Sequence, residues 1–376
     1  MEKKRIDYFD LARGIGIILV IIGHIEYMPI EFHTFVISFH MPLFFVISGM
    51  LLFINREAEK ELPSFVKKRA HGIMLPYLYF SLIYIVVYVF YYLIKDRTVM
   101  WQQARTNLVS SLTLNGISVL WFLPALFISE VVFIFLVKKI KTLAAPAVIV
   151  LFIISLILNR ALQMNYLAYS TTAPYMLALM ILRAFICMFF IGFGYFFFLI
   201  REKLLQKPTG DPHKDFWQGS SERISKKEIS SAIIDLLIGA ALITAVVFFS
   251  RINLIIDLRA CSFGNPYVYF TTAIFGSLGV IFLMKSTEII INRKPLFPLK
   301  YLGKNSLIIM LTHLDLFVLY VAEVFAMHFN KKISTEYGTA FNIMTVAFVL
   351  IAEVFIIEII NRFFPFLVAK KKNPDK

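Results

Sequence analysis

The sequence predicts an all-α membrane protein, a polytopic bundle of about ten transmembrane helices. Of its 376 residues, 59% are hydrophobic and 16% are charged, and a soluble domain of this length cannot bury so much apolar surface in one core. Apolar runs near the roughly 20 residues that cross a bilayer recur along the whole chain. Each run is expected to be a helix, because an open strand edge or irregular coil in lipid leaves backbone groups unpaired.

Ten apolar runs are assigned as spans. They cover residues 9–28, 33–54, 73–94, 119–137, 144–158, 175–200, 232–250, 266–284, 305–327 and 339–361. Residues 201–231 are polar and rich in Lys, Ser, Gly and Pro, which predicts a cytoplasmic linker. Residues 362–376 form a basic tail, also predicted to be cytoplasmic. We therefore expect one integral-membrane domain over residues 1–376.

The distribution of Lys and Arg predicts the orientation of the bundle. With the N-terminus inside, the inner segments and termini hold 28 of the 38 basic residues, and the outer loops hold 8. Cytoplasmic loops of membrane proteins carry an excess of Lys and Arg, so both termini are predicted to be cytoplasmic. The formal net charge of +14 is then a topology signal, and no nucleic-acid partner is expected.

Several ionisable side chains lie inside the predicted spans, where a mid-helix charge costs about 3 kcal/mol on insertion scales. They are Asp10, Arg13, His24, His40, Glu130, Arg183, His313, Asp315, Glu323, Glu353 and Glu358. Each of them either pairs with a group on another helix, snorkels to the end of its span, or serves a function.

The first span places two of these side chains on one helical face. His24 follows Arg13 by eleven residues, which in a continuous helix is about 20° past three full turns and roughly 16 Å along the axis. Asp10 lies one turn before Arg13, near enough to balance its charge. Gly14 allows a neighbouring helix or a ligand to approach closely.

The second span brings a further histidine to the depth of His24. Pro42 lacks the amide hydrogen that a helix interior uses, so a kink is expected near residues 38–42. Because the two spans are antiparallel, His40 and His24 are expected to lie in the outer half and to line a cavity. The alternative for His40 is a hydrogen bond to a backbone carbonyl freed at the kink. No metal site is expected, because no Asp or Glu stands at a ligand spacing from these histidines.

Five motifs occur in order along the whole chain. They are Arg13 followed after ten residues by His24, Phe39-His40-Met41-Pro42-Leu43-Phe44-Phe45 with Ser48-Gly49, Lys67-Lys68-Arg69 leading to Pro76-Tyr77, Leu120-Trp121-Phe122-Leu123-Pro124-Ala125-Leu126, and Gly303-Lys304-Asn305-Ser306-Leu307 running to His313. Together they resemble the membrane-bound acyltransferase family 3, especially its sugar O-acetyltransferase branch, described as fucose 4-O-acetylase-like. The chain departs from that family at His71-Gly72, where a second basic residue is common.

The resemblance implies transfer of an acyl group, usually acetyl, from cytoplasmic acyl-CoA to a hydroxyl of a cell-surface or lipid-linked carbohydrate. It implies catalytic roles for His24, Arg13 and Asp10, with His24 as general base or transient acyl acceptor. Arg13 is suited to grip phosphate or polarise the thioester carbonyl. Lys67, Lys68 and Arg69 are suited to attract the nucleotide phosphates of the donor, although their alternative role is to hold that loop inside.

The acceptor cavity is expected in the outer half of the bundle. Its predicted lining residues are His40, Ser48, Trp121, Glu130, Arg183 and His313. The expected partners are acyl-CoA, a glycan acceptor and the lipid bilayer, with acetyl-CoA as the donor and no permanently bound cofactor. The expected location is the inner (plasma) membrane of a bacterium.

Two other classes of protein share the same composition. A transporter or flippase of a lipid-linked saccharide also needs many spans and buried ionisable residues. Transporters often carry repeated halves with broken helices in matching positions, and the second half of this sequence has no clear partners for Pro42 and Pro124. A structural or sensor protein would make the shared face of Arg13 and His24 a coincidence.

Overall fold

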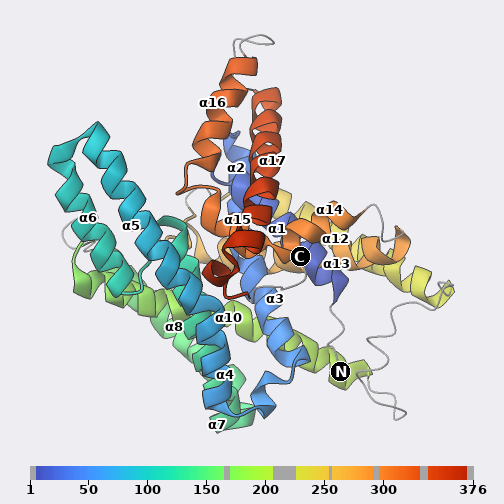
Figure 1. The fold of residues 1–376 in the computed structure, drawn as a ribbon. Helices are drawn as coiled ribbons and strands as arrows, with labels where there is room; N and C mark the ends of the chain where they lie inside the picture. The colour runs from blue at the N-terminus through green and yellow to red at the C-terminus, as the bar shows by residue number, and fades with distance from the viewer. Residues whose placement is uncertain are drawn as a thin grey trace.

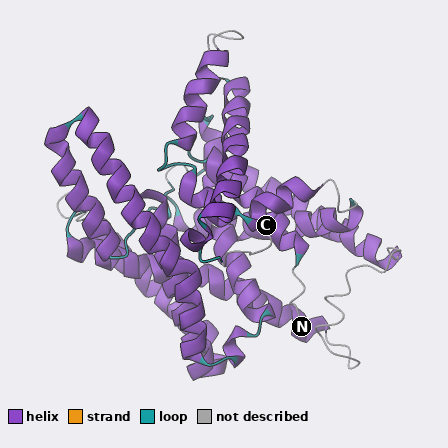
Figure 2. Ribbon diagram, viewed as in Figure 1, coloured by secondary structure: helices purple, strands orange, loops and turns teal. Residues whose placement is uncertain are grey.

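The structure, a computed structural model, describes residues 6–164, 170–205, 226–253, 256–291, 296–330 and 338–370. Within these ranges all the regular elements are helices, and the only extended pairing is an isolated bridge between Asp257 and Ser262 (Figure 2). The predicted class is confirmed: the chain is an all-α membrane bundle.

Most of the helices are long, and a few single turns connect them (Figure 1). The α-helices are α1 (Asp7–Ile22), α2 (Ile30–Ile37), α3 (His40–Ile54), α4 (Leu62–Arg69), α5 (Leu75–Lys95), α6 (Arg97–Leu112), α7 (Phe122–Ile140), α8 (Ala144–Gln163), α10 (Ala173–Leu205), α12 (Lys226–Ser250), α13 (Pro266–Ile290), α14 (Phe297–Lys304), α15 (Ser306–Thr312), α16 (Val318–Asn330) and α17 (Thr339–Phe363). The short turns are η1 (Glu57–Glu59), η2 (Ala70–Met74, a π-helical turn), η3 (Ser118–Trp121), η4 (Lys141–Leu143) and η6 (Pro365–Val368).

Seven helical stretches of the described residues are long and apolar enough to cross a membrane. They are Ile30–Ile54, Leu62–Lys95, Ser118–Gln163, Ala173–Arg201, Glu228–Ser250, Pro266–Ile290 and Thr339–Phe363. These stretches contain eight of the ten predicted spans, because Ser118–Gln163 includes both α7 and α8. The count of ten and the cytoplasmic position of the termini stay predictions.

The other two predicted spans differ from continuous helices. The helix in the first span, α1, ends at Ile22, where the chain tightens into a turn in which the amide of His24 bonds the Ile21 carbonyl at 3.1 Å. The span predicted at 305–327 is broken between α15 and α16. Phe317 has a φ of 61° at this break, a left-handed conformation that no α-helix continues through.

The break expected in the second span is confirmed. One helix, α2, ends at Ile37 and the next, α3, begins at His40. Pro42 lies in the first turn of α3, where its missing N–H would have no partner within the helix in any case. The chain therefore changes direction at Ser38 and Phe39 without leaving a helical donor unpaired.

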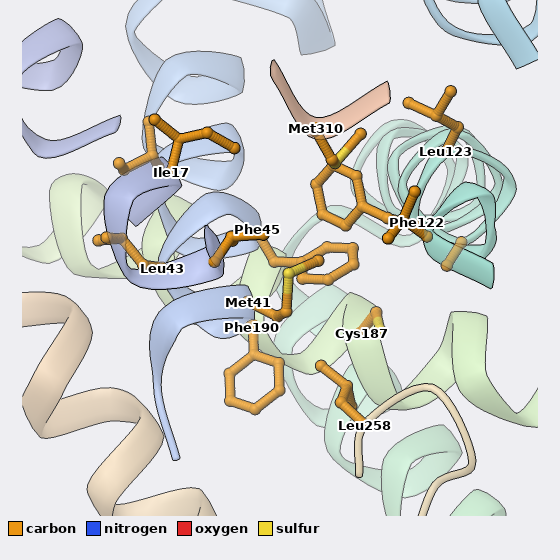
Figure 3. Packing of buried hydrophobic residues seen from close by; sticks show 14 of the residues in the cluster. Ile17, Met41, Leu43, Phe45, Phe122, Leu123, Cys187, Phe190, Leu258 and Met310 are labelled. Atoms are coloured by element: carbon orange, nitrogen blue, oxygen red, sulfur yellow. The ribbon is translucent and has the colours of Figure 1, made fainter. Parts of the chain in front are cut away.

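The centre of the bundle is where α1, α3, α7, α10 and α15 meet. Helix α3 packs on α10, and α10 also packs on α7 and α8, while α1 packs on α13 and α14. Figure 3 shows Ile17 of α1, Phe45 of α3, Phe122 of α7, Phe190 of α10 and Met310 of α15 around one buried region. This packing fixes the positions of the helices that carry the candidate site.

Glycine permits the close crossing of α3 and α10. A Cβ atom added to Gly49 would lie 1.9 Å from the backbone oxygen of Ile191, and one added to Gly194 would lie 2.2 Å from that of Val46. Small residues at such crossings let two backbones approach within van der Waals contact. The two helices could not keep this separation with any larger residue at either position.

We expect Gly49→Ala to lower the free energy of unfolding by about 1–3 kcal/mol, the usual cost of overpacking. The control is Gly72→Ala, because a Cβ at Gly72 meets nothing within 4 Å and alanine favours a helix over glycine. The melting temperature of each variant in detergent is measured by the loss of the monodisperse peak in size-exclusion chromatography after heating. Equal melting temperatures would show that α3 and α10 can separate without cost.

Candidate active site

A cavity of about 270 Å³ opens among residues that the sequence places in the outer half of the bundle. Its polar lining consists of His24, His33, His40, Trp121, Asp257 and Arg259, and its apolar lining includes Val20, Ile37, Met41, Val119, Ile256, Leu258 and Met310. A largely apolar cavity with a few convergent polar groups is typical of a small-molecule site.

His24 lies at this cavity with an exposed side chain. It follows Gly23, the C-cap of α1, so the helical face that we expected it to share with Arg13 ends before it. After this tight turn His24 still lines the cavity as an exposed residue. A ring in this position is accessible to a hydroxyl group that enters the cavity.

His40 and His313 bind backbone carbonyls in the same way. Nδ1 of His40 lies 3.0 Å from the Val36 carbonyl oxygen, as the alternative for this residue foresaw, and Nδ1 of His313 lies 2.8 Å from that of Ile309. His40 also lines the cavity. His313 does not, because it is fully buried, but its ring centroid is 5.3 Å from that of His24.

Trp121 and Arg183 form one wall of the cavity in two layers. Trp121 lines the cavity and Arg183 lies behind it, with its guanidinium 5.4 Å from the Trp121 ring centroid. Arg183 is 1% exposed, and it donates hydrogen bonds to the backbone and side-chain oxygens of Asn115 at 3.1 and 3.0 Å. Arg183 thus supports the tryptophan through a cation–π contact and does not face the cavity itself.

A second polar cluster joins α1, α3, α4 and α7, among residues that the sequence places in the inner half. Arg69 donates to Oε1 of Glu130 at 2.7 Å, and the Ser48 hydroxyl donates to the same oxygen. Arg13 lies 3.8 Å from Asp10 and within electrostatic range of Glu130. The structure therefore brings Ser48 and Glu130 together with Arg69, rather than with the histidines.

The three basic residues before α5 have different surroundings. Lys67 is exposed, and Lys68 lies 3.0 Å from Glu57. Burial of Glu57 raises its pKa, but hydrogen bonds from Lys60 and Lys68 outweigh this effect, so the net pKa lies below its usual value. Glu57 is therefore ionised at neutral pH and neutralises these lysines. Arg69 alone turns into the bundle, just before the π-helical turn η2, a feature that often marks functional sites.

Packed side chains separate the two clusters. Ile17 lies between Arg13 and His24 in the sequence, and Leu43 and Phe45 lie between His40 and Ser48. All three are fully buried, and Figure 3 shows them in the packed core. A Cβ added to Gly16 would lie 3.0 Å from the Phe44 ring, so α1 and α3 are in close contact at this level. A molecule that reached from Arg13 to His24 along α1 and α3 would meet these packed side chains.

Three polar residues at the cavity escaped the sequence analysis: His33, Asp257 and Arg259. His33 lies at the start of a predicted span, and its Nε2 is 3.1 Å from the Gly23 carbonyl oxygen. The other two belong to a turn closed by hydrogen bonds between the backbones of Asp257 and Ser262. Polar residues are ordinary in outer loops, so only their position over the cavity distinguishes them. Among the described residues, no group of three His, Cys, Asp or Glu side chains is arranged to hold a metal ion.

Comparison with known proteins agrees with these features. The profile of acyltransferase family 3, described as an acyltransferase domain, matches residues 6–360. The nodulation protein NolL of Mesorhizobium japonicum is 30% identical over 131 residues, which are 32% of this chain and 33% of NolL. The chain thus matches about a third of the length of this curated relative, and no solved structure matches it. Because the profile covers nearly the whole sequence, the chain belongs to acyltransferase family 3.

Proposed function

We propose that this protein is a membrane O-acyltransferase that moves an acetyl group from cytoplasmic acetyl-CoA to a hydroxyl group of a cell-surface or lipid-linked carbohydrate. The observation that carries the proposal is the exposed imidazole of His24 in a cavity of about 270 Å³. Family membership supports the transfer chemistry, and it gives no support to the alternative of a saccharide flippase.

In this proposal His24 acts as the general base. A nitrogen of its ring accepts the proton of the acceptor hydroxyl while the oxygen attacks the thioester carbonyl carbon. The carbon–sulfur bond then breaks, and the leaving thiolate takes the proton from His24. A positioned neutral imidazole suits this role near pH 7. In a two-step variant the same ring carries the acetyl group between donor and acceptor.

The donor is proposed to enter from the inner half. Arg69 remains 28% exposed while it pairs with Glu130, so part of its guanidinium is accessible to a phosphate. Arg13 on α1 is within electrostatic range of the same Glu130. The pantetheine arm would run from there toward His24 once the packed residues along α1 and α3 separate. Trp121 offers the acceptor an aromatic face in the cavity. The proposed setting is the inner membrane of a bacterium.

Purified protein in detergent, supplied with radiolabelled acetyl-CoA and a glycan fraction from the parent cells, tests this function. We expect label to appear in the glycan in proportion to enzyme. Label on the protein in the absence of glycan would assign the two-step route. No labelled product, with protein that is folded by size-exclusion chromatography, would contradict the proposal.

Arg13→Lys should lower the rate of transfer by about 10²-fold or more, in the range seen when one preorganised charge-stabilising donor is lost. Lysine keeps the charge but loses the planar pair of donors that binds phosphate or carboxylate in a bidentate manner. The control is Arg105→Lys on the exposed surface of α6. Initial rates with acetyl-CoA measure both, and full activity of Arg13→Lys would reduce Arg13 to a simple charge.

A further inference from the structure

His313 stands at the break between α15 and α16, directly behind His24. Its side chain is 0% exposed, and its ring lies at 31° to the His24 ring with 5.3 Å between the centroids. A polar side chain with this degree of burial needs hydrogen-bond partners for both ring nitrogens, because an unmade bond in a dry interior is costly.

The hydrogen bond of Nδ1 determines the tautomer of His313. A carbonyl oxygen only accepts, so the Nδ1 atom that lies 2.8 Å from the Ile309 oxygen must carry the proton of the neutral ring. Nε2 is then an acceptor. This atom is buried, and no described residue donates a hydrogen bond to it. The ring thus presents a buried lone pair to which no described residue donates, and the centroid of the His24 ring is 5.3 Å from its own.

We propose that His313 is a positioning residue, whose Nε2 accepts a hydrogen bond from the ring N–H of His24 when the acceptor hydroxyl is bound. Hydrogen bonds of this kind are often long before the substrate is present and shorten in the complex. This inference rests on the proposed function, because it assigns His313 to the proton transfer carried out by His24.

The consequence for His24 is a single reactive tautomer. With one nitrogen donating to His313, the other nitrogen carries its lone pair toward the cavity, where the acceptor hydroxyl loses its proton. In serine proteases an aspartate orients the catalytic histidine in the same sense. Here a neutral imidazole does so, and it gains no proton during the reaction.

Two isosteric amides separate this role from a purely structural one. In His313→Asn the amide nitrogen takes the place of Nδ1, so the bond to Ile309 is kept and the Nε2 acceptor is lost. In His313→Gln the amide oxygen takes the place of Nε2, so the acceptor is kept and the bond to Ile309 is lost. A structural role predicts that Asn is the better substitute, and a positioning role predicts that Gln is.

We expect His313→Asn to lower kcat by about 10- to 100-fold, the loss typical when the partner that orients a histidine is removed, with KM for donor and glycan unchanged. His313→Gln should retain at least about tenfold more kcat than His313→Asn. Equal kcat values, or higher activity of the Asn variant, would overturn the positioning role.

NMR spectroscopy of the full-length protein with ¹⁵N-labelled histidine tests the positioning role independently of kinetics. The His24 signals, identified by their loss in His24→Ala, should report one tautomer in the wild type and a mixture in His313→Asn. An unchanged His24 tautomer in that variant would overturn the inference even if kcat falls. If the wild type transfers no acetyl group, the proposed function fails instead, and the tautomer measurement still tests the contact between the two rings.

Discussion

Replacement of His24 by alanine should lower acetyl transfer by about 10²- to 10⁴-fold, the contribution usual for a general base. His24 lines the cavity with an exposed ring, and the loss of this ring removes the group that takes the proton from the acceptor. The fold should survive, because the side chain does not belong to the buried core. Initial rates with radiolabelled acetyl-CoA measure the effect.

The matched control for this variant is His328→Ala. His328 is exposed on α16, and it is not among the residues that line the cavity. Its removal should leave the rate within about twofold of wild type, the change expected from a surface substitution far from a site. Transfer by His24→Ala at the rate of His328→Ala would remove His24 from the mechanism.

Arg69→Leu should lower both stability and affinity for the donor. The change leaves the carboxylate of Glu130, which is 1% exposed, with the Ser48 hydroxyl as its hydrogen-bond partner. An uncompensated charge of this kind costs about 3–5 kcal/mol. A thermal melt of the purified protein measures the loss of stability, and KM for acetyl-CoA measures the loss of affinity.

A double variant separates the two effects. Adding Glu130→Gln to Arg69→Leu removes the unpaired charge, so much of the melting temperature should return. KM for acetyl-CoA should stay raised by about 10-fold or more, the value of a charge-assisted hydrogen bond. Lys67→Leu is the control for stability, since Lys67 is exposed. If the double variant regains a normal KM, Arg69 serves only to neutralise Glu130.

The fold class was predictable because it depends on the composition of single runs of sequence. Apolar length and the need to pair every backbone group in lipid predict helices, and eight of the ten predicted spans lie in the long apolar stretches of the structure. The change of direction before α3 was also predictable, because proline is tolerated in the first turn of a helix and not in its interior, so Pro42 marks the start of α3. The hydrogen bond from His40 to Val36 follows from the same local geometry.

The arrangement of the site depends on contacts between distant residues. Arg69 and Glu130 are 61 positions apart, and Arg259 reaches the cavity from the turn between α12 and α13. No periodicity in either segment indicates the other. The early end of α1 at Ile22 likewise changes how His24 is presented, because a turn rather than a helical face now directs its ring.

The sequence by itself determined that this chain is a helical membrane protein of acyltransferase family 3, and it indicated which polar residues are unusual in a bilayer. Only the tertiary structure decided which of them meet: the histidines at one cavity, with His313 behind His24, and Arg69 with Glu130 and Ser48 at the other end. The physical reason is that insertion into lipid is a property of each segment, whereas the pairing of buried polar groups depends on which helices become neighbours.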